Sequence, residues 1–430
     1  MPGTLHTKRE NGLVFPPNWT EIGYSNTPES TLEGFNYAKE IDENWDTSVH
    51  TYIEAFKDDY KLMYFPNMSY EKRYSMERCD RMFQGSNLEY FNSGLPFIQQ
   101  ISSMFASCHN LRYCKITELE NTGINTINGL FTDCFQLERV EVNFDTLPSS
   151  VTQMTNLFSA CWNLKEIHIN NDNIERADGA FQNTYKLEEA IIKLKKCYNT
   201  SFYASGKDST NGVSIDLYIG ETATQGVFFT FEKAKIACNG SKIIVRNCNS
   251  MQSAFRNAIF NMIGEGSTIT IDIRDYNSLG VNCSFAFQNA TMNRQPFILF
   301  SINRINNAIS MFDGATFSSS DGYINLSSTD FSLCTNLSKA FANSNVSELY
   351  KIEEKVFSNC TNFENMFQNS PNLIDDTING LLLALTTANS SYPNRTLAHL
   401  GFNSTDYPAS RIQSLSNYNT FVSSGWSIGY

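Results

Sequence analysis

A motif that recurs every 22 to 27 residues constrains the fold of this chain more than any other feature. The stretch from Ile98 to Ile116 carries Met104-Phe105, followed by Cys108 and Leu111. The same order returns around Leu130-Phe131 and Leu157-Phe158, and in a weaker copy around Ala180-Phe181. A repeat of this length is typical of a solenoid, in which each unit buries its apolar side only by stacking on its neighbours.

Each unit has two apolar patterns. Counted from the phenylalanine, apolar residues fall at −7, −4, −1, 0 and often +3, the spacing of one face of an α-helix. Further apolar residues at +9 and +11 have the alternation of a strand with one buried face. The sequence therefore predicts an α/β solenoid, with a parallel sheet on one face and short helices on the other.

The repeat frame divides the chain into three expected parts. Residues 1–45 are predicted to be an N-terminal arm, Met1–Asn26, followed by a capping helix that Ser30-Thr-Leu-Glu33 opens as a capping box. Residues 46–376 are predicted to form the solenoid, with about twelve or thirteen units. Between residues 193 and 240 the repeat spacing becomes irregular, and we refer to this stretch as the blurred frame. Residues 377–430 are expected to form a C-terminal cap module.

The eleven cysteines fall into columns of the repeat. Cys108, Cys134 and Cys161 share position +3, where other units carry small residues such as Ser86 and Ala258. There is no Cys-x-x-Cys pair, and an odd count fits no closed disulfide framework. These observations favour buried free thiols that act as small hydrophobic residues over a disulfide or metal site.

Composition and motif searches restrict the possible functions. The net charge of −12 argues against nucleic acid as the partner, and the lack of an apolar run of 18 residues argues against membrane insertion. The first ten residues have no apolar stretch after their charges, so no export signal is expected. Nucleotide-binding, serine-hydrolase, zinc-protease and EF-hand motifs are missing, so we expect no catalytic residue, metal site or cofactor. A glycan-cleaving enzyme would need a carboxylate pair, for which the spacing offers no candidate.

Strand side chains that point away from the core are the best candidates for binding. Stacked strands would align them into a ribbon on the open face of the sheet, a kind of surface that solenoids use for recognition. An ordinary solvated face is the alternative. The residues of this predicted ribbon are Tyr113, Lys115, Arg139, Glu141, Glu166, His168 and Glu189.

The Met104-Phe-Ala-Ser-Cys-His-Asn-Leu111 motif resembles the BspA-like leucine-rich repeat family, and the resemblance extends over about Val49–Leu373. That family includes bacterial surface proteins and proteins of gut bacteriophages. The ending, Leu415–Tyr430, is similar to the tails of phage-encoded members. The resemblance implies a non-enzymatic leucine-rich-repeat solenoid that works by binding or as a structural part.

Two functions follow from the resemblance and stay open at this point. The first is a virion structural protein, such as a decoration, head-fibre or tail component. Its expected partners are other virion proteins, further copies of itself, and a host surface protein or glycan. The second is a bacterial cell-surface adhesin of the same family. The expected location is accordingly the virion, or alternatively the bacterial surface.

Overall fold

The computed structural model describes residues 8–10, 13–15, 37–65, 68–120, 122–196, 201–221, 231–261, 268–275, 279–293, 297–317 and 322–430. The chain forms two compact units, Met1–Leu187 and Glu188–Tyr430. Most of the expected N-terminal arm lies outside the described residues. The expected boundaries at residues 45 and 376 stay predictions.

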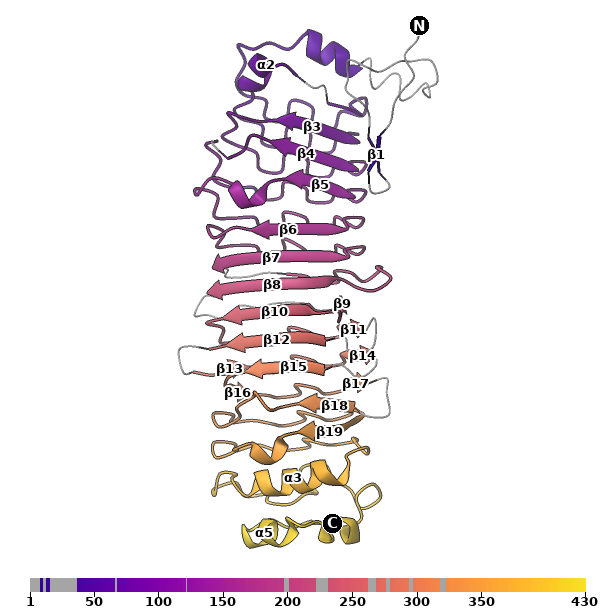
Figure 1. Ribbon diagram of the computed structural model, residues 1–430, viewed down its shortest axis with the longest axis vertical. Helices are drawn as coiled ribbons and strands as arrows, with labels where there is room; N and C mark the ends of the chain where they lie inside the picture. The colour runs from indigo at the N-terminus through magenta and orange to yellow at the C-terminus, as the bar shows by residue number, and fades with distance from the viewer. Residues whose placement is uncertain are drawn as a thin grey trace. The chain divides into compact units, whose positions relative to one another are not determined.

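The first unit is built from short strands that follow one another at the repeat period (Figure 1). Three of them pair in parallel, with Tyr90, Tyr113 and Arg139 side by side. A separate pair, β1 and β2, is antiparallel. The strands are β1 (Lys8–Glu10), β2 (Leu13–Phe15), β3 (Tyr90–Gly94), β4 (Tyr113–Thr117), β5 (Arg139–Val142) and β6 (Glu166–Asn170). The helices are α2 (Tyr70–Tyr74), the 3-10 turn η3 (Phe144–Thr146) and a helical stretch over 37–43.

The main sheet of the second unit runs in the order β19-β18-β15-β12-β10-β8-β7 and is parallel throughout. These strands are β7 (Glu189–Lys196), β8 (Ser214–Glu221), β10 (Ser241–Arg246), β12 (Thr268–Arg274), β15 (Phe297–Ile302), β18 (Gly322–Asn325) and β19 (Val346–Tyr350). The strands of this sheet from β7 to β15 are longer than those of the first unit.

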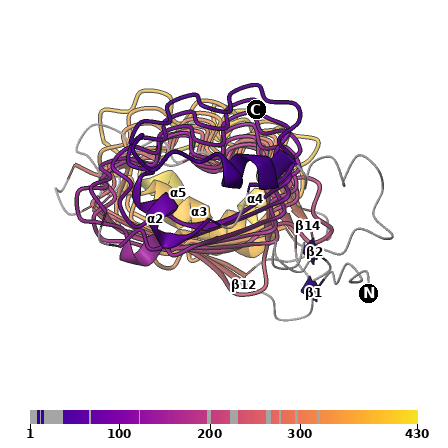
Figure 2. The ribbon, with the colours of Figure 1, turned by 90° about the horizontal axis from the view of Figure 1, so that it is seen from above.

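Shorter strands occupy other sides of the second unit, and Figure 2 shows β12 and β14 on different sides of it. One parallel sheet has the order β17-β14-β11-β9, and β13 pairs with β16. These strands are β9 (Lys235–Ala237), β11 (Ile259–Asn261), β13 (Val281–Asn282), β14 (Thr291–Asn293), β16 (Ile305–Asn307) and β17 (Thr316–Phe317). The helices are η4 (Ile352–Glu354), α3 (Asp375–Leu385), α4 (Ala409–Gln413) and α5 (Tyr418–Ser423). Among the helices that the structure describes, none has the length and apolar character needed to cross a membrane.

Alternating burial explains why the repeat strands form a sheet with one inner face. In β12 the isoleucines 269, 271 and 273 are buried, while the residues between them are partly exposed. Side chains of a strand alternate between its two faces, so the apolar set packs inward and the polar set faces outward. The parallel sheet predicted from the +9 and +11 positions is confirmed in the first unit, where Cys114 and Ile116 stand nine and eleven residues after Phe105. Both are buried, and their strand β4 pairs in parallel with β3 and β5.

The phenylalanines of the repeats stack into a column inside each unit. In the first unit the rings of Phe105 and Phe131 lie 5.6 Å apart and nearly parallel, and those of Phe131 and Phe158 lie 5.5 Å apart. In the second unit Phe202 stacks on Phe231 at 4.9 Å, so the column includes the stretch where the sequence frame blurs. These rings are buried.

The helices expected before each phenylalanine are a wrong prediction within the described residues, because these segments are chains of turns. Around Phe105, the N–H groups of Met104 and Ala106 donate to carbonyls three residues back, at 3.2 and 3.0 Å. The N–H groups that alternate with these, of Ser103, Phe105 and Ser107, donate to the next repeat instead, as in Phe105 N to Leu130 O at 3.1 Å. An α-helix would use every one of these donors internally, so the turns gain a second set of bonds between repeats.

The positions two residues before and after the phenylalanine explain how the turns are made. Ser103, Ser107, Gly129 and Asp133 all have positive φ, between 53° and 62°. This left-handed conformation interrupts a helix and is most accessible to glycine and to short polar residues. The apolar spacing of three and four residues is thus shared by a helix and by this turn chain.

The cysteines described by the structure are all free and buried, as predicted. Cys108, Cys134 and Cys161 each donate a hydrogen bond from Sγ to a phenylalanine carbonyl of the preceding repeat, at 2.9 to 3.1 Å. Burial raises the pKa of the Cys108 thiol to about 12. A protonated thiol is therefore a structural group here and not a nucleophile.

Candidate binding faces

The outer face of β4 and β5 brings four of the predicted ribbon residues together. Tyr113 is paired with Arg139, and Lys115 with Glu141. Lys115 Nζ lies 3.0 Å from one Glu141 oxygen, and Arg139 Nη2 lies 2.9 Å from the other. Both cations share the same carboxylate, so the three side chains form one network in which each cation is already paired and the net charge is a single positive one.

Tyr113 does not belong to the open ribbon, which corrects its predicted place. Only 8% of Tyr113 is exposed, and it packs in a cluster with Tyr64, Tyr90 and the fully buried Ala38 of the 37–43 helical stretch. Burial, with the nearby Glu141 carboxylate, raises the pKa of the Tyr113 hydroxyl. The cause is a contact between residues far apart in the sequence, which strand alternation cannot reveal.

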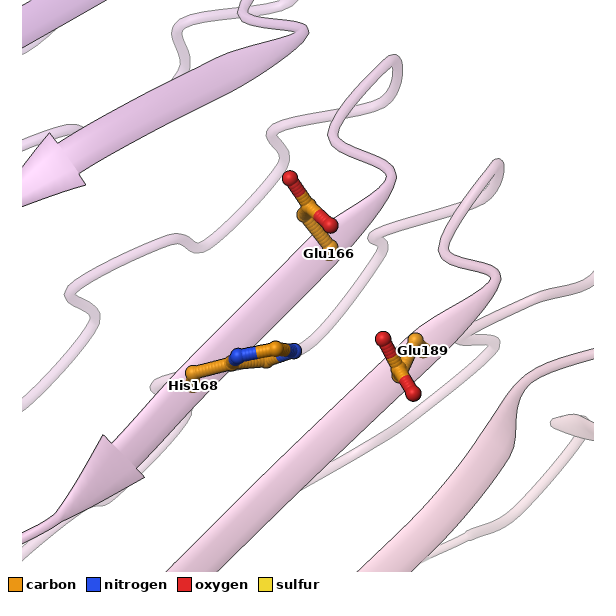
Figure 3. A group of neighbouring side chains, drawn as sticks. All are labelled: Glu166, His168 and Glu189. Atoms are coloured by element: carbon orange, nitrogen blue, oxygen red, sulfur yellow. The ribbon is translucent and has the colours of Figure 1, made fainter. Parts of the chain in front are cut away.

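Glu166 and His168 occupy outward positions on β6, where the burial pattern alternates strictly. Both are exposed, and Figure 3 shows them on the same strand. Glu189 is the first residue of β7, is also exposed, and belongs to the second unit. The predicted ribbon therefore divides into a charge-paired part, a buried tyrosine and three exposed polar side chains.

An aromatic ladder in the first unit was missed by the sequence analysis. His109 stacks on Phe135 at 4.6 Å, Phe135 on Trp162 at 4.1 Å, and Trp162 on Tyr185 at 5.9 Å. All four residues stand four positions after a column phenylalanine, so their recurrence could have predicted the stack. Because each ring face covers the next, the ladder binds neighbouring repeats together and presents mainly ring edges to solvent.

The outer face of the main sheet in the second unit was also missed. Strand pairing arranges its side chains in three rows across β7, β8, β10 and β12. The first row is Ile191, Asp216, Lys242 and Thr270, and the second is Lys193, Tyr218, Ile244 and Asp272. The third row, at the carboxyl ends of the strands, is Lys195, Gly220, Arg246 and Arg274. We call these twelve residues the basic face, since they include five cationic and two acidic side chains.

Asp272 is the one paired carboxylate of the basic face. Arg246 Nη2 lies 2.8 Å from one of its oxygens, and Arg274 Nε lies 2.7 Å from the other. Arg274 also donates to Ser301 Oγ at 2.9 Å. Two arginines on one aspartate leave a net positive charge and hold both guanidinium groups in fixed positions.

A separate groove of about 340 Å³ lies at the end of the main sheet, beside α3. Tyr350, Lys351, Glu353 and Asp376 are among its polar lining residues. Lys351 Nζ lies 2.7 Å from Glu354 and sits over the Tyr350 ring. The lysine of the groove is thereby engaged within the chain.

Comparison with known protein families supports the resemblance seen in the repeats. A model of the BspA type leucine rich repeat region matches residues 76–207, in six copies. No curated protein and no solved structure matches the chain significantly. The parallel-sheet solenoid with few short helices agrees with repeats of this type.

Proposed function

We propose that this chain is a non-enzymatic binding protein that uses the outer face of its repeat sheet, and that it works as a structural component of a bacteriophage virion. The match to BspA type repeats supports the first part, since such repeats suggest a protein-binding or adhesin-like role and are typically non-catalytic. The similarity of Leu415–Tyr430 to phage-encoded tails supports the second part.

The observation that supports the binding role is that the repeats bury their apolar positions and leave their polar strand positions on the outer face. Apolar positions such as Phe131 and Cys134 are buried in the stack, and the described repeats from Phe83 to Phe367 share this arrangement. Polar positions of the strands remain on the outer face, where they form an extended surface of charged and aromatic side chains. A solenoid of this kind offers a long binding surface without a deep pocket.

In the proposed virion role, the N-terminal arm attaches the chain to other virion proteins and the repeat face meets the host. An arm that orders on binding can lay its backbone along a partner. Many copies on one particle would strengthen weak individual contacts with a host protein or glycan. Deleting residues 1–26 should then leave the repeats folded but remove the chain from particles. Normal occupancy of the truncated chain on particles would exclude the arm as the anchor.

A bacterial surface adhesin is the second candidate, and the adhesin-like character of the matched repeats favours it. Antibodies against the folded chain can separate the two roles when applied to purified particles and to uninfected cells. Labelling of particles alone would support the virion role, and labelling of uninfected cells would support the adhesin. An absence of label on both would contradict both.

A further inference from the structure

We propose that the basic face of the second unit binds an acidic glycan, a polymer whose sugar rings carry carboxylate or sulfate groups. The proposal deepens the proposed function, because it names the ligand class for the outer face of the repeat sheet. It rests on the charge, exposure and spacing of the side chains that β7, β8, β10 and β12 place side by side.

Positive charge is concentrated on this face although the whole chain has a net charge of −12. Neighbouring strands lie about 4.8 Å apart and alternate residues about 6.6 Å apart, so the five cations fit within roughly 14 by 13 Å. The Debye length is about 10 Å at 0.1 M salt, so a ligand on this face is attracted by these cations more than it is repelled by distant carboxylates.

The lysines of the face are available to a ligand. Lys193, Lys195 and Lys242 are exposed, and among the described residues no carboxylate forms an ion pair with any of them. This differs from Lys115 in the first unit, which is already paired with Glu141. A ligand anion can thus pair with the lysines without breaking an existing ion pair.

Tyr218 gives the face an apolar surface between the charges. It is 40% exposed and lies between Lys193 and Ile244 in the second row. An aromatic ring flanked by an aliphatic side chain can cover the apolar side of a sugar ring, while neighbouring cations bind its acidic group.

Gly220 leaves a gap in the third row, between Lys195 and Arg246. A β-carbon at this position would lie 2.8 Å from the Lys195 carbonyl oxygen, so a side chain is excluded. The backbone is therefore bare between two cations, and a chain-like ligand can cross the sheet here at close range.

Charge density favours a glycan over a nucleic acid. Duplex DNA carries one charge per roughly 1.7 Å of its axis. The five cations of the basic face are spread among neutral side chains and do not match that charge density. An acidic glycan separates its charges by neutral rings, which suits cations interspersed with a tyrosine, an isoleucine and a glycine.

The test measures binding of the full chain to polygalacturonate and to chondroitin sulfate, with methyl-esterified polygalacturonate as a matched neutral polymer. We expect binding to at least one acidic polymer at about 0.05 M salt and its loss at about 0.5 M. The esterified polymer should not bind, because its rings remain but its charges are removed.

Variants locate the site. Lys193→Gln with Lys195→Gln should weaken binding about tenfold, because the double variant loses two solvent-exposed ion pairs with the ligand. Lys165→Gln with Lys339→Gln removes the same charge from exposed positions off the face and should leave binding unchanged. Tyr218→Ala should weaken binding, and Tyr218→Phe should retain it. Thermal unfolding of each variant checks that the fold is intact.

Failure to bind either acidic polymer, equal binding of the esterified one, or equal loss in both lysine pairs would overturn the proposal. Tighter binding of a single-stranded oligonucleotide would contradict the glycan proposal and identify nucleic acid as the ligand. None of these results would affect antibody labelling of particles or cells, so a failure here is distinguishable from a failure of the proposed function.

Discussion

Cys134 Sγ donates a hydrogen bond to the carbonyl oxygen of Phe105, 3.0 Å away and one repeat earlier in the chain. The same carbonyl accepts the N–H of Cys108 within its own turn, at 3.0 Å. One acceptor thus serves both the turn and the stacking of two repeats. Cys108 and Cys161 make equivalent bonds with the repeats before them.

Thiol labelling tests this arrangement. The described cysteines are buried, so reaction with a maleimide should be slow in the folded chain and complete after unfolding in urea. Mass spectrometry can assign the rate to each residue. Fast labelling of Cys134 in the folded chain would contradict its place in the core.

The raised pKa of the Cys108 thiol predicts a loss of stability at alkaline pH. Its pKa is about 12 in the folded chain, against an ordinary value of 9.0. Above pH 9.0 the unfolded thiol loses its proton while the folded one keeps it, so the free energy of unfolding falls as pH rises towards 12. Its contribution is present in full below pH 9.0.

Urea unfolding between pH 9.0 and 10.0 measures this effect below the ordinary tyrosine pKa of 10.0. The other buried thiols with raised pKa contribute to the same slope, so the share of Cys108 is the difference from a variant. Cys108→Ala should reduce the slope of stability against pH, whatever its effect on stability at neutral pH. An identical slope in this variant would show that the thiol titrates normally.

Phe131→Ala should destabilise the stack by about 3–5 kcal/mol, because it removes a fully buried ring from the column. Each repeat contacts only its neighbours, so hydrogen exchange should increase near residues 105–158 and much less elsewhere. Phe135→Ala is the matched control, since this ring is only half-buried. Equal losses in the two variants would argue against the column as the main core.

Gly206→Ala should also destabilise the fold. Gly206 has φ of +65°, and a β-carbon there would lie 2.7 Å from both the Lys235 carbonyl oxygen and the Val213 nitrogen. These are backbone atoms, so relieving the clash requires a shift of neighbouring repeats.

The converse change, Ala160→Gly, should stabilise the fold by up to about 1 kcal/mol, because Ala160 has φ of +58°. Chemical denaturation measures the free energy of unfolding of both variants, which should fall for Gly206→Ala and rise for Ala160→Gly.

Tyr407 anchors the C-terminal segment to the last repeats. Its hydroxyl donates to the Ser370 carbonyl and accepts the Leu373 N–H at 3.2 Å, and the side chain is buried. Tyr407→Phe should cost about 1–3 kcal/mol, because two buried backbone groups lose a partner. Tyr418→Phe, at a half-buried tyrosine, should cost less. Limited proteolysis should release the tail of the first variant sooner.

The core was predictable because the apolar and cysteine columns repeat in register. Phe131, Cys134 and Leu137 occupy the interior places that their spacing indicated. The turn chain was not predicted as such, because its apolar spacing of three and four residues is that of a helix. Positive-φ residues such as Gly129 and Asp133 were the available signal for turns.

The binding faces were predictable only in part. Strand alternation predicted Lys115 and Glu141 in one ribbon, and the strand register shows them as direct neighbours. The burial of Tyr113 involves Ala38, whose contact cannot be seen along the sequence. The basic face was missed because Lys193, Lys195 and Tyr218 lie where the repeat spacing is irregular, so their register with the following strands could not be predicted. Lys195 and Arg246 become neighbours only through the register of three strands.

A blocking experiment tests most directly that the outer face of the repeat sheet is the binding surface. Lys242→Cys places a reactive thiol on the basic face, and Lys339→Cys places one at an exposed position away from it. Each variant is reacted with a bulky polyethylene-glycol maleimide, and attachment of the labelled chain to host cells is counted by flow cytometry. We predict that the group at position 242 abolishes attachment and that the group at position 339 leaves it unchanged. Unchanged attachment with position 242 blocked would contradict the account.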